Sequence, residues 1–135
     1  MRVFFDTNIL ISAMIWPKSN PAKAVSIASS YPNVGVICDE SVNEMIRIIN
    51  KKFPQYISVV EKFLFKTITS LDFVHVPPEH YEIEELIRDI KDRPLLRAAI
   101  KAEADLFLTG DKDFLEAGIE NPRIISVADF IELFS

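Results

Sequence analysis

The 135-residue chain contains only one cysteine, three glycines and two histidines. A single cysteine, Cys38, excludes an internal disulfide and favours a reducing compartment. Cys38 lies in the apolar run 34–38, where we expect a small buried side chain rather than a nucleophile. The scarcity of glycine leaves no glycine-rich loop, so the sequence has neither a P-loop nor a dinucleotide-binding fingerprint. The few histidines and the one cysteine do not form a zinc-binding pattern.

Long hydrophobic runs are also missing, so we expect no membrane span. The apolar N-terminal run is interrupted by Asp6-Thr7-Asn8, and no small-residue cleavage site is evident. We therefore expect a cytoplasmic protein with a single domain over residues 1–135, a length sufficient for one core. The formal net charge of −5 and a pI of about 5.0 argue against nucleic-acid binding through overall positive charge. They do not exclude an acidic metal site that reaches phosphate through its cations.

Short apolar runs alternate with helical patterns along the chain, which predicts an α/β fold with a parallel sheet covered on both faces. The expected strands are 2–6, 34–38, 72–76, 105–109 and 124–125. The expected helices are 9–15, 21–30, 40–52, 55–68, 79–88, 92–104, 111–117 and one that starts at Ser126. Thr7 or Asn8 and Asp39 are suitable N-caps for two of these helices.

Two acidic residues follow apolar runs at opposite ends of the chain. Asp6 follows Val3-Phe4-Phe5, and Asp111 follows a run that ends at Thr109-Gly110. If both runs are neighbouring parallel strands, their carboxyl ends meet at one crevice. Two like charges at ~4 Å repel by about 4 kcal/mol at an effective dielectric near 20, so such a pair usually exists to hold a cation. Asp105 starts its strand and should therefore lie at the opposite end of the sheet. We assign it no function.

Further acids follow the other elements, each with a structural alternative. Glu44 lies in the first turns of helix 40–52, where a solvated helix face or a helix-dipole partner is the alternative. Glu40, one turn earlier, is a weaker candidate. Asp92 precedes a helix and could serve only as its N-cap, with Asp89 as a rival for the site. Asp113 could equally cap the short helix after the last long strand.

Basic residues accompany two of these acids. Arg47 and Lys51 share a helix face with Glu44. Arg93 and Arg97 follow Asp92 and form a row on the helix that begins there. Such rows of basic residues are most often ordinary solvated helix faces. Their positions beside site acids nevertheless make RNA phosphate contacts a hypothesis to test.

These residues, in this order, resemble the PIN-domain family of metal-dependent ribonucleases, over essentially the whole chain. The similarity is greatest to the VapC-type toxins of prokaryotic toxin–antitoxin pairs. The matching segments are Asp6-Thr7-Asn8, Ser41-Val42-Asn43-Glu44, Arg88-Asp89-Ile90-Lys91-Asp92-Arg93-Pro94 through Ala98-Ala99, and Ala104-Asp105-Leu106-Phe107-Leu108-Thr109-Gly110-Asp111-Lys112-Asp113-Phe114.

The resemblance implies a three-layer α/β/α sandwich and catalysis with one or two Mg²⁺ or Mn²⁺ ions. The implied catalytic residues and metal ligands are Asp6, Glu44, Asp92 and Asp111. Asn8 and Thr109 would orient these carboxylates. This agrees with the chemistry of the residues themselves, because carboxylate oxygens suit hard divalent cations.

The sequence departs from many PIN toxins at the third acid. Asp92 is followed by Arg93-Pro94, and the run to Ala98 is one residue longer, which leaves Asp89 as an alternative ligand. We prefer Asp92, because the helix start directs its carboxylate towards the crevice.

The function implied is a metal-dependent endoribonuclease that cleaves single-stranded RNA, acting as the toxin of a type II pair with a cognate antitoxin. We also expect a homodimer, by the resemblance and because segment 55–68 has more apolar residues than one core-facing stripe needs. One alternative is a non-catalytic PIN-fold module that binds RNA or protein. Another alternative is a phosphatase with Asp6 as nucleophile, although that motif requires a second aspartate at the position that Asn8 occupies.

Overall fold

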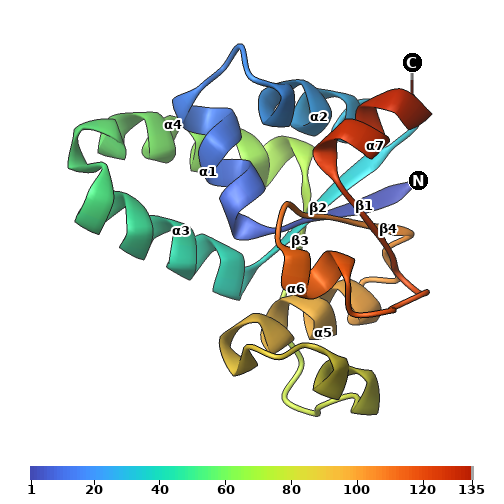
Figure 1. Cartoon of the computed structure of the whole chain (residues 1–135). Coiled ribbons are helices and arrows are strands. Elements are labelled where there is room, and N and C mark those ends of the chain that lie inside the picture. Colours follow the sequence, from blue (N-terminus) through green and yellow to red (C-terminus); the bar gives the residue numbers. More distant parts are fainter. Residues whose placement is uncertain (135) are drawn as a thin grey trace.

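A twisted sheet of five parallel strands runs through the middle of the molecule (Figure 1). The computed structural model describes residues 1–134, and the side chains of these residues apart from 67 and 68. The strands are β1 (Arg2–Phe5), β2 (Val34–Cys38), β3 (Asp72–Val74), β4 (Leu106–Leu108) and β5 (Arg123–Ile125), arranged in the order β3-β2-β1-β4-β5. The chain adds β2 and β3 on one side of β1 and then β4 and β5 on the other. The strand order therefore reverses between β1 and β4, the point where parallel α/β sheets bind ligands.

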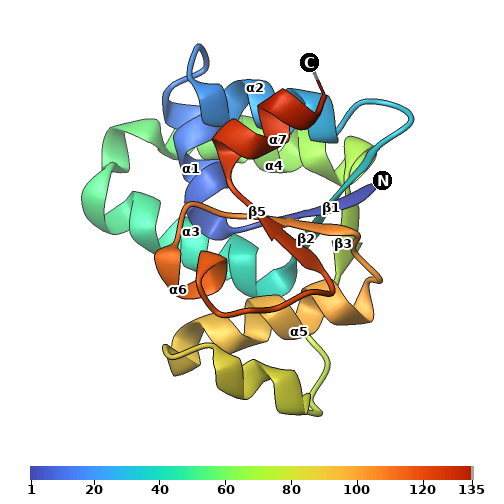
Figure 2. The same ribbon diagram turned by 45° about the vertical axis from the view of Figure 1, so that its right-hand side comes forward.

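Helices cover both faces of this sheet, which confirms the three-layer α/β/α fold (Figures 1 and 2). They are α1 (Thr7–Ile15), α2 (Asn20–Ala28), α3 (Asp39–Lys52), α4 (Ile57–Ser70), α5 (Arg93–Lys101), α6 (Lys112–Leu115) and α7 (Val127–Leu133). Side chains alternate along β1. Val3 and Phe5 pack in the core beneath α1 to α4 and α7, whereas Phe4 packs in the second core with α5 and α6. Both faces are buried, so the strands consist of continuous apolar runs.

The expected strands are all present, and one expected helix is not. Segment 79–88 forms a short 3₁₀ helix, η2 (Glu82–Leu86), which a second one, η3 (Ile90–Asp92), follows just before α5. Only Ile83 and Ile87 of this segment pack against the core, while Leu86 is 52% exposed. A regular helix would therefore have too little apolar area to hold it. None of the helices within residues 1–134 has both the length and the apolar character needed to cross a membrane.

Two expected N-caps are wrong. The helix α1 begins at Thr7, so Asp6 occupies the N-cap position that we gave to Thr7 or Asn8. Cys38 occupies the N-cap position of α3, and Asp39 is its first residue. The Asp39 carboxylate accepts hydrogen bonds from the backbone N–H groups of Glu40 and Val76, so it ties α3 to the segment after β3.

Candidate active site

Asp6 lies at the end of β1, where the sheet ends beside the strand-order reversal. Its backbone N–H donates to the Leu108 carbonyl at 3.0 Å, so the β1–β4 pairing continues to this residue. Although Asp6 occupies the N-cap position of α1, its side chain makes no capping hydrogen bond. The residue is only 6% exposed. A buried carboxylate that its own helix does not use requires another explanation.

Thr109 connects Asp6 to Asp111. The Thr109 hydroxyl donates a 2.6 Å hydrogen bond to Oδ2 of Asp6 and accepts one of 3.0 Å from the Asp111 backbone N–H. Thr109 is fully buried, and its own N–H donates to the Ile125 carbonyl of β5. One hydroxyl therefore fixes the carboxylate after β1 and the turn after β4.

Glu44 reaches the same crevice from α3. Its Oε2 lies 3.4 Å from the Thr7 hydroxyl, which donates to it. Burial raises the pKa of Glu44, the negative charge of Asp6 raises it further, and Arg47 partly offsets both effects. The partner Thr7 was not identified from the sequence, where we considered it only as a helix cap. Its place directly after the site acid Asp6 was the only signal in the sequence, and its complete burial became evident from the structure.

Asp111 occupies the N-cap position of α6, and its Oδ1 accepts the Asp113 backbone N–H at 2.9 Å. Asp111, rather than Asp113, is therefore the cap. The Asp113 carboxylate instead forms an exposed ion pair of 3.1 Å with Arg88. Gly110 does not adopt a positive φ, and the space beside its Cα is open.

Asp92 stands at the start of α5 without serving as its side-chain cap. It occupies the N-cap position, yet its carboxylate accepts no capping hydrogen bond. Burial raises the pKa of Asp92 to about 7, together with repulsion from Asp89, Asp6, Asp111 and Glu44 in that order. By contrast, Asp89 caps η3 by accepting the Lys91 N–H at 3.0 Å. The helix-cap explanation thus accounts for Asp89 and fails for Asp92.

These acids share one electrostatic environment although they come from four separate segments of the chain. Burial raises the pKa of Asp6, and the neighbouring charge of Asp111 adds to this against the opposing hydrogen bond from Thr109. Glu44 and Asp92 both experience the charge of Asp6. Crowded carboxylates that disfavour each other's ionisation are typical of a functional site.

The donor set has the chemistry of a hard divalent cation site, since it consists of carboxylate oxygens. The side chains do not form a closed cage, because no three acidic, histidine or cysteine side chains within the described residues are placed to hold a metal ion. Binding a cation would therefore require the side chains to rotate towards one another. Asp105 precedes β4, where its carboxylate accepts the Arg2 backbone N–H at the opposite edge of the sheet.

The four basic residues proposed as phosphate contacts lie in different environments. Arg47 lines a cavity of about 560 Å³ with Glu44 and Asp92, and Lys51 is exposed near the end of α3. Arg93 donates to the Ile87 carbonyl at 2.9 Å. Arg97 is 7% exposed, and its guanidinium is engaged by Glu84 and the Pro77 carbonyl. The structure thus removes Arg97 from the accessible cations.

Asn8 does not take the orienting role that we gave it. It is exposed, and within residues 1–134 its side chain donates no hydrogen bond to a site carboxylate. Lys91 lines the same cavity as Arg47 and was not singled out from the sequence. Its position depends on η3, the 3₁₀ turn before α5, which lies where we expected no helix.

Comparison with known proteins agrees with this α/β architecture. Residues 2–113 match the PIN domain family, and the chain belongs to that family. The uncharacterised protein MJ1680 of Methanocaldococcus jannaschii is 26% identical over 122 residues, which span 90% of this chain and 77% of that protein.

Two solved structures share the fold. VapBC2 from Rickettsia felis, bound to a DNA fragment from its promoter, superposes with a TM-score of 0.70 at 17% identity and covers 93% of this chain and 98% of that chain. VapC20 of Mycobacterium tuberculosis, a toxin that cleaves the sarcin-ricin loop, gives a TM-score of 0.61 at 19% identity over 87% and 95% of the two chains.

Proposed function

We propose that this protein is a PIN-domain endoribonuclease that cleaves single-stranded RNA with the help of Mg²⁺ or Mn²⁺. The observation that carries the proposal is the convergence of Asp6, Glu44, Asp92 and Asp111 at the strand-order reversal. Three of the four have a pKa that burial raises and that the charge of neighbouring acids raises further, and a bound cation would offset both effects.

Each acid has a distinct part in this proposal. Asp6 and Asp111 stand on the rigid end of the sheet, where Thr109 holds both in place. Glu44 and Asp92 approach from α3 and the start of α5. All four would hold one or two divalent ions. Such ions, when bound, polarise a phosphodiester and lower the pKa of water. Asp92 is the preferred third acid over Asp89, because the Asp89 carboxylate already caps η3.

Single-stranded RNA suits this crevice better than a duplex. The formal net charge of −5 disfavours binding of a duplex backbone through overall positive charge. A strand that can be splayed out brings its phosphodiester to a narrow site at the sheet edge. The sarcin-ricin loop named for the M. tuberculosis neighbour is an RNA target, which supports RNA as the substrate class here.

We also propose that the protein acts as the toxin of a type II toxin–antitoxin pair. Both structural neighbours carry names of such systems, and the R. felis structure is of a complex bound to promoter DNA. The neighbouring open reading frame is the simplest test. A small adjacent gene for a DNA-binding protein that co-purifies with this chain would support a cognate antitoxin.

A homodimer forms part of the proposal. Of the apolar residues on α4, Val60 is buried, whereas Ile57, Val59 and Phe65 are 39%, 37% and 79% exposed. Within the described residues, exposed apolar side chains thus lie on more than one side of α4, and Ile57 also lines a hollow between α3 and α4. Exposed apolar surfaces of this kind often mark interfaces.

The activity is tested by incubating the purified protein with Mn²⁺ and sequence-matched single-stranded RNA, duplex RNA and single-stranded DNA. We expect cleavage of the single-stranded RNA and its loss in EDTA. Faster cleavage of the duplex, or cleavage that persists in EDTA, would defeat the proposal. Hydrolysis of p-nitrophenyl phosphate that depends on Asp6, without RNA cleavage, would favour the phosphatase alternative. RNA binding without any cleavage would favour a non-catalytic module.

A further inference from the structure

A cavity at the mouth of the acidic crevice has cations on two opposite walls. Its volume is about 560 Å³, within the roughly 300–1,000 Å³ typical of small-ligand clefts. The α3 wall contributes Arg47, and the segment that leads into α5 contributes Lys91. The complete lining is Glu40, Glu44, Arg47, Asp89, Lys91, Asp92 and Pro94. The cavity therefore contains room for one nucleotide unit beside the proposed catalytic acids.

The side chains of these two cations are not held in place by other residues. Within residues 1–134, the side chains of Arg47 and Lys91 make neither an ion pair within 4.0 Å nor a hydrogen bond. Other arginines are engaged: Arg2 pairs with Asp72 and Arg97 with Glu84. Cationic side chains left unpaired beside acids are available to an incoming anion.

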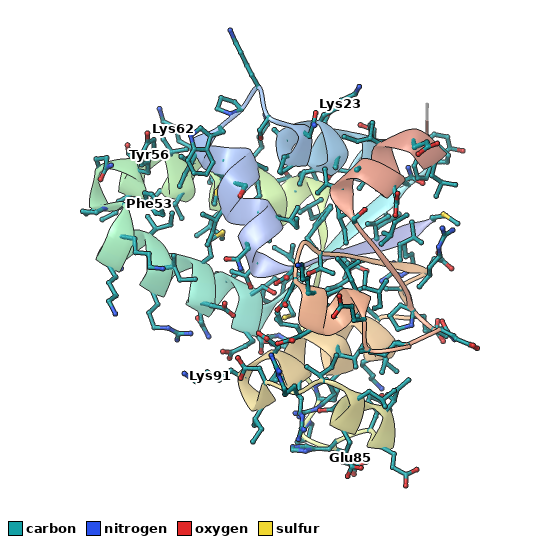
Figure 3. All side chains as sticks on the ribbon, in the orientation of Figure 1. Lys23, Phe53, Tyr56, Lys62, Glu85 and Lys91 are labelled. Atoms are coloured by element: carbon teal, nitrogen blue, oxygen red, sulfur yellow. The ribbon has the colours of Figure 1, made fainter. Side chains whose placement is uncertain are left out.

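A hydrogen bond holds the backbone of Lys91 in place. The Asp89 carboxylate accepts the Lys91 backbone N–H at 3.0 Å, which holds the η3 turn. The side chain then projects outward on the side of the molecule below α3 (Figure 3). Because the turn is held by this bond, Lys91 needs little ordering of the chain to meet a ligand.

The charges of the acidic residues that line the cavity determine when an anion can bind. Glu44 and Asp92 are among the proposed metal ligands, so a bound cation would offset their charge. The remaining Glu40 and Asp89 are then matched by Arg47 and Lys91. The metal-loaded cavity is thus close to neutral, with Arg47 and Lys91 among its lining residues.

We infer that this cavity is a subsite for the RNA backbone phosphate next to the scissile one, contacted by Lys91 and Arg47 from opposite walls. The inference rests on the proposed function, and it assigns a role to Lys91 that sequence patterns did not indicate. Arg47 offers the planar fork that suits phosphate oxygens, and Lys91 offers a compact point charge.

The test measures binding of an uncleavable, fully 2′-O-methylated single-stranded oligonucleotide in Mn²⁺ by fluorescence anisotropy at several salt concentrations. Removing one cation that binds a phosphate flattens the slope of log K against log salt by about 0.7. We expect this change for Lys91→Ala and for Arg47→Ala, and a near wild-type slope for Lys91→Arg. Lys23→Ala, on α2 across the sheet (Figure 3), is the matched control and should leave the slope unchanged.

Cleavage of the unmodified oligonucleotide is measured in parallel, so that the two proposals fail separately. If wild type cleaves RNA and Lys91→Ala keeps both the wild-type slope and the wild-type KM, the subsite is overturned and the nuclease stands. If wild type cleaves nothing while Lys91→Ala still flattens the slope, the nuclease is overturned and the phosphate site stands. A raised KM with unchanged kcat for Lys91→Ala supports the subsite.

Discussion

Thr109 and Asp6, 103 residues apart in the sequence, are joined by a buried 2.6 Å hydrogen bond from the threonine hydroxyl to Oδ2 of the carboxylate. The same hydroxyl accepts the Asp111 N–H. These two bonds place the acids after β1 and β4 in a fixed relation. The bond from Thr109 also lowers the otherwise raised pKa of Asp6, which helps keep that carboxylate ionised in a buried place.

We expect Thr109→Val to reduce cleavage by roughly 10- to 100-fold, the usual effect of losing a group that orients a metal ligand. It should also cost about 1–3 kcal/mol of stability, because the buried Asp6 oxygen loses its donor. Thr109→Ser retains the hydroxyl and should recover most of both. Kinetics and urea unfolding of the two variants provide the comparison, and equal activity of Thr109→Val and wild type would contradict it.

The acid substitutions should separate catalysis from folding. Asp6→Asn and Asp111→Asn should abolish cleavage while leaving metal-free stability unchanged or increased, because each removes a repelling charge. Asp105→Asn is the matched control and should keep full activity, since Asp105 lies at the opposite edge of the sheet. Activity assays and thermal unfolding in EDTA test this. Wild-type rates for Asp6→Asn would mean that the proposed site is wrong.

The same comparison decides the third acid. Asp92→Asn should abolish cleavage, whereas Asp89→Asn should retain most of it, because asparagine can still accept the Lys91 N–H. The reverse pattern would identify Asp89 as the ligand.

The contribution of Asp92 to the stability of the metal-free protein should fall as pH rises from about 4 to about 7. The pKa of Asp92 is about 7 when folded and near 3.8 when unfolded. Between these values the folded state holds a proton that the unfolded state has released, so raising the pH favours unfolding. Subtracting the thermal midpoints of Asp92→Asn from those of wild type in EDTA isolates this effect.

A bound metal ion should reverse this dependence of stability on pH. Mn²⁺ at about a hundred times its dissociation constant adds ~2.7 kcal/mol, and it competes with protons for the same carboxylates. We therefore expect a larger Mn²⁺-induced midpoint shift at pH 8 than at pH 5. An equal shift at both values, or none at millimolar Mn²⁺, would count against a carboxylate metal site.

The sheet and its acidic edge could be predicted from the sequence because they depend on local pattern. Runs such as Val3-Phe4-Phe5 are typical of buried strands, and parallel pairing then brings Asp6 and Asp111 to one edge. The pairing of Glu84 with Arg97 could not be predicted, since it depends on how η2 folds back onto α5. The proposed role of Lys91 could not be predicted either, because it depends on the position of η3.

Glu84 and Arg97 should be important for stability. They are 2% and 7% exposed and form a 2.8 Å ion pair that attaches η2 to α5. Burial alone would raise the pKa of Glu84, but the hydrogen bonds from Arg97 and the Tyr81 N–H lower it. We expect Arg97→Ala to cost about 3–5 kcal/mol, because it leaves a buried charge unpaired.

The exposed pair Arg88–Asp113 is the control, and Arg88→Ala should cost no more than about 1 kcal/mol. The contribution of Glu84 is present above its ordinary pKa near 4.5 and is lost as pH falls through its lower folded value. Glu84→Gln should therefore show a weaker loss of stability on acidification than wild type. Urea unfolding between pH 3 and 7 measures both effects, and equal costs for Arg97→Ala and Arg88→Ala would refute the assignment.

Phe65 should be a determinant of self-association. It is 79% exposed on α4, a helix that also exposes Ile57 and Val59, so its removal should cost the monomer little. If two copies bury Phe65 against each other, Phe65→Ser should shift light-scattering masses at micromolar concentration from dimer towards monomer. Tyr31, which is 97% exposed in the loop before β2, provides the matched control, and Tyr31→Ser should leave the mass unchanged. A monomeric wild type would reject the dimer, and a dimer that persists in Phe65→Ser would place the interface elsewhere.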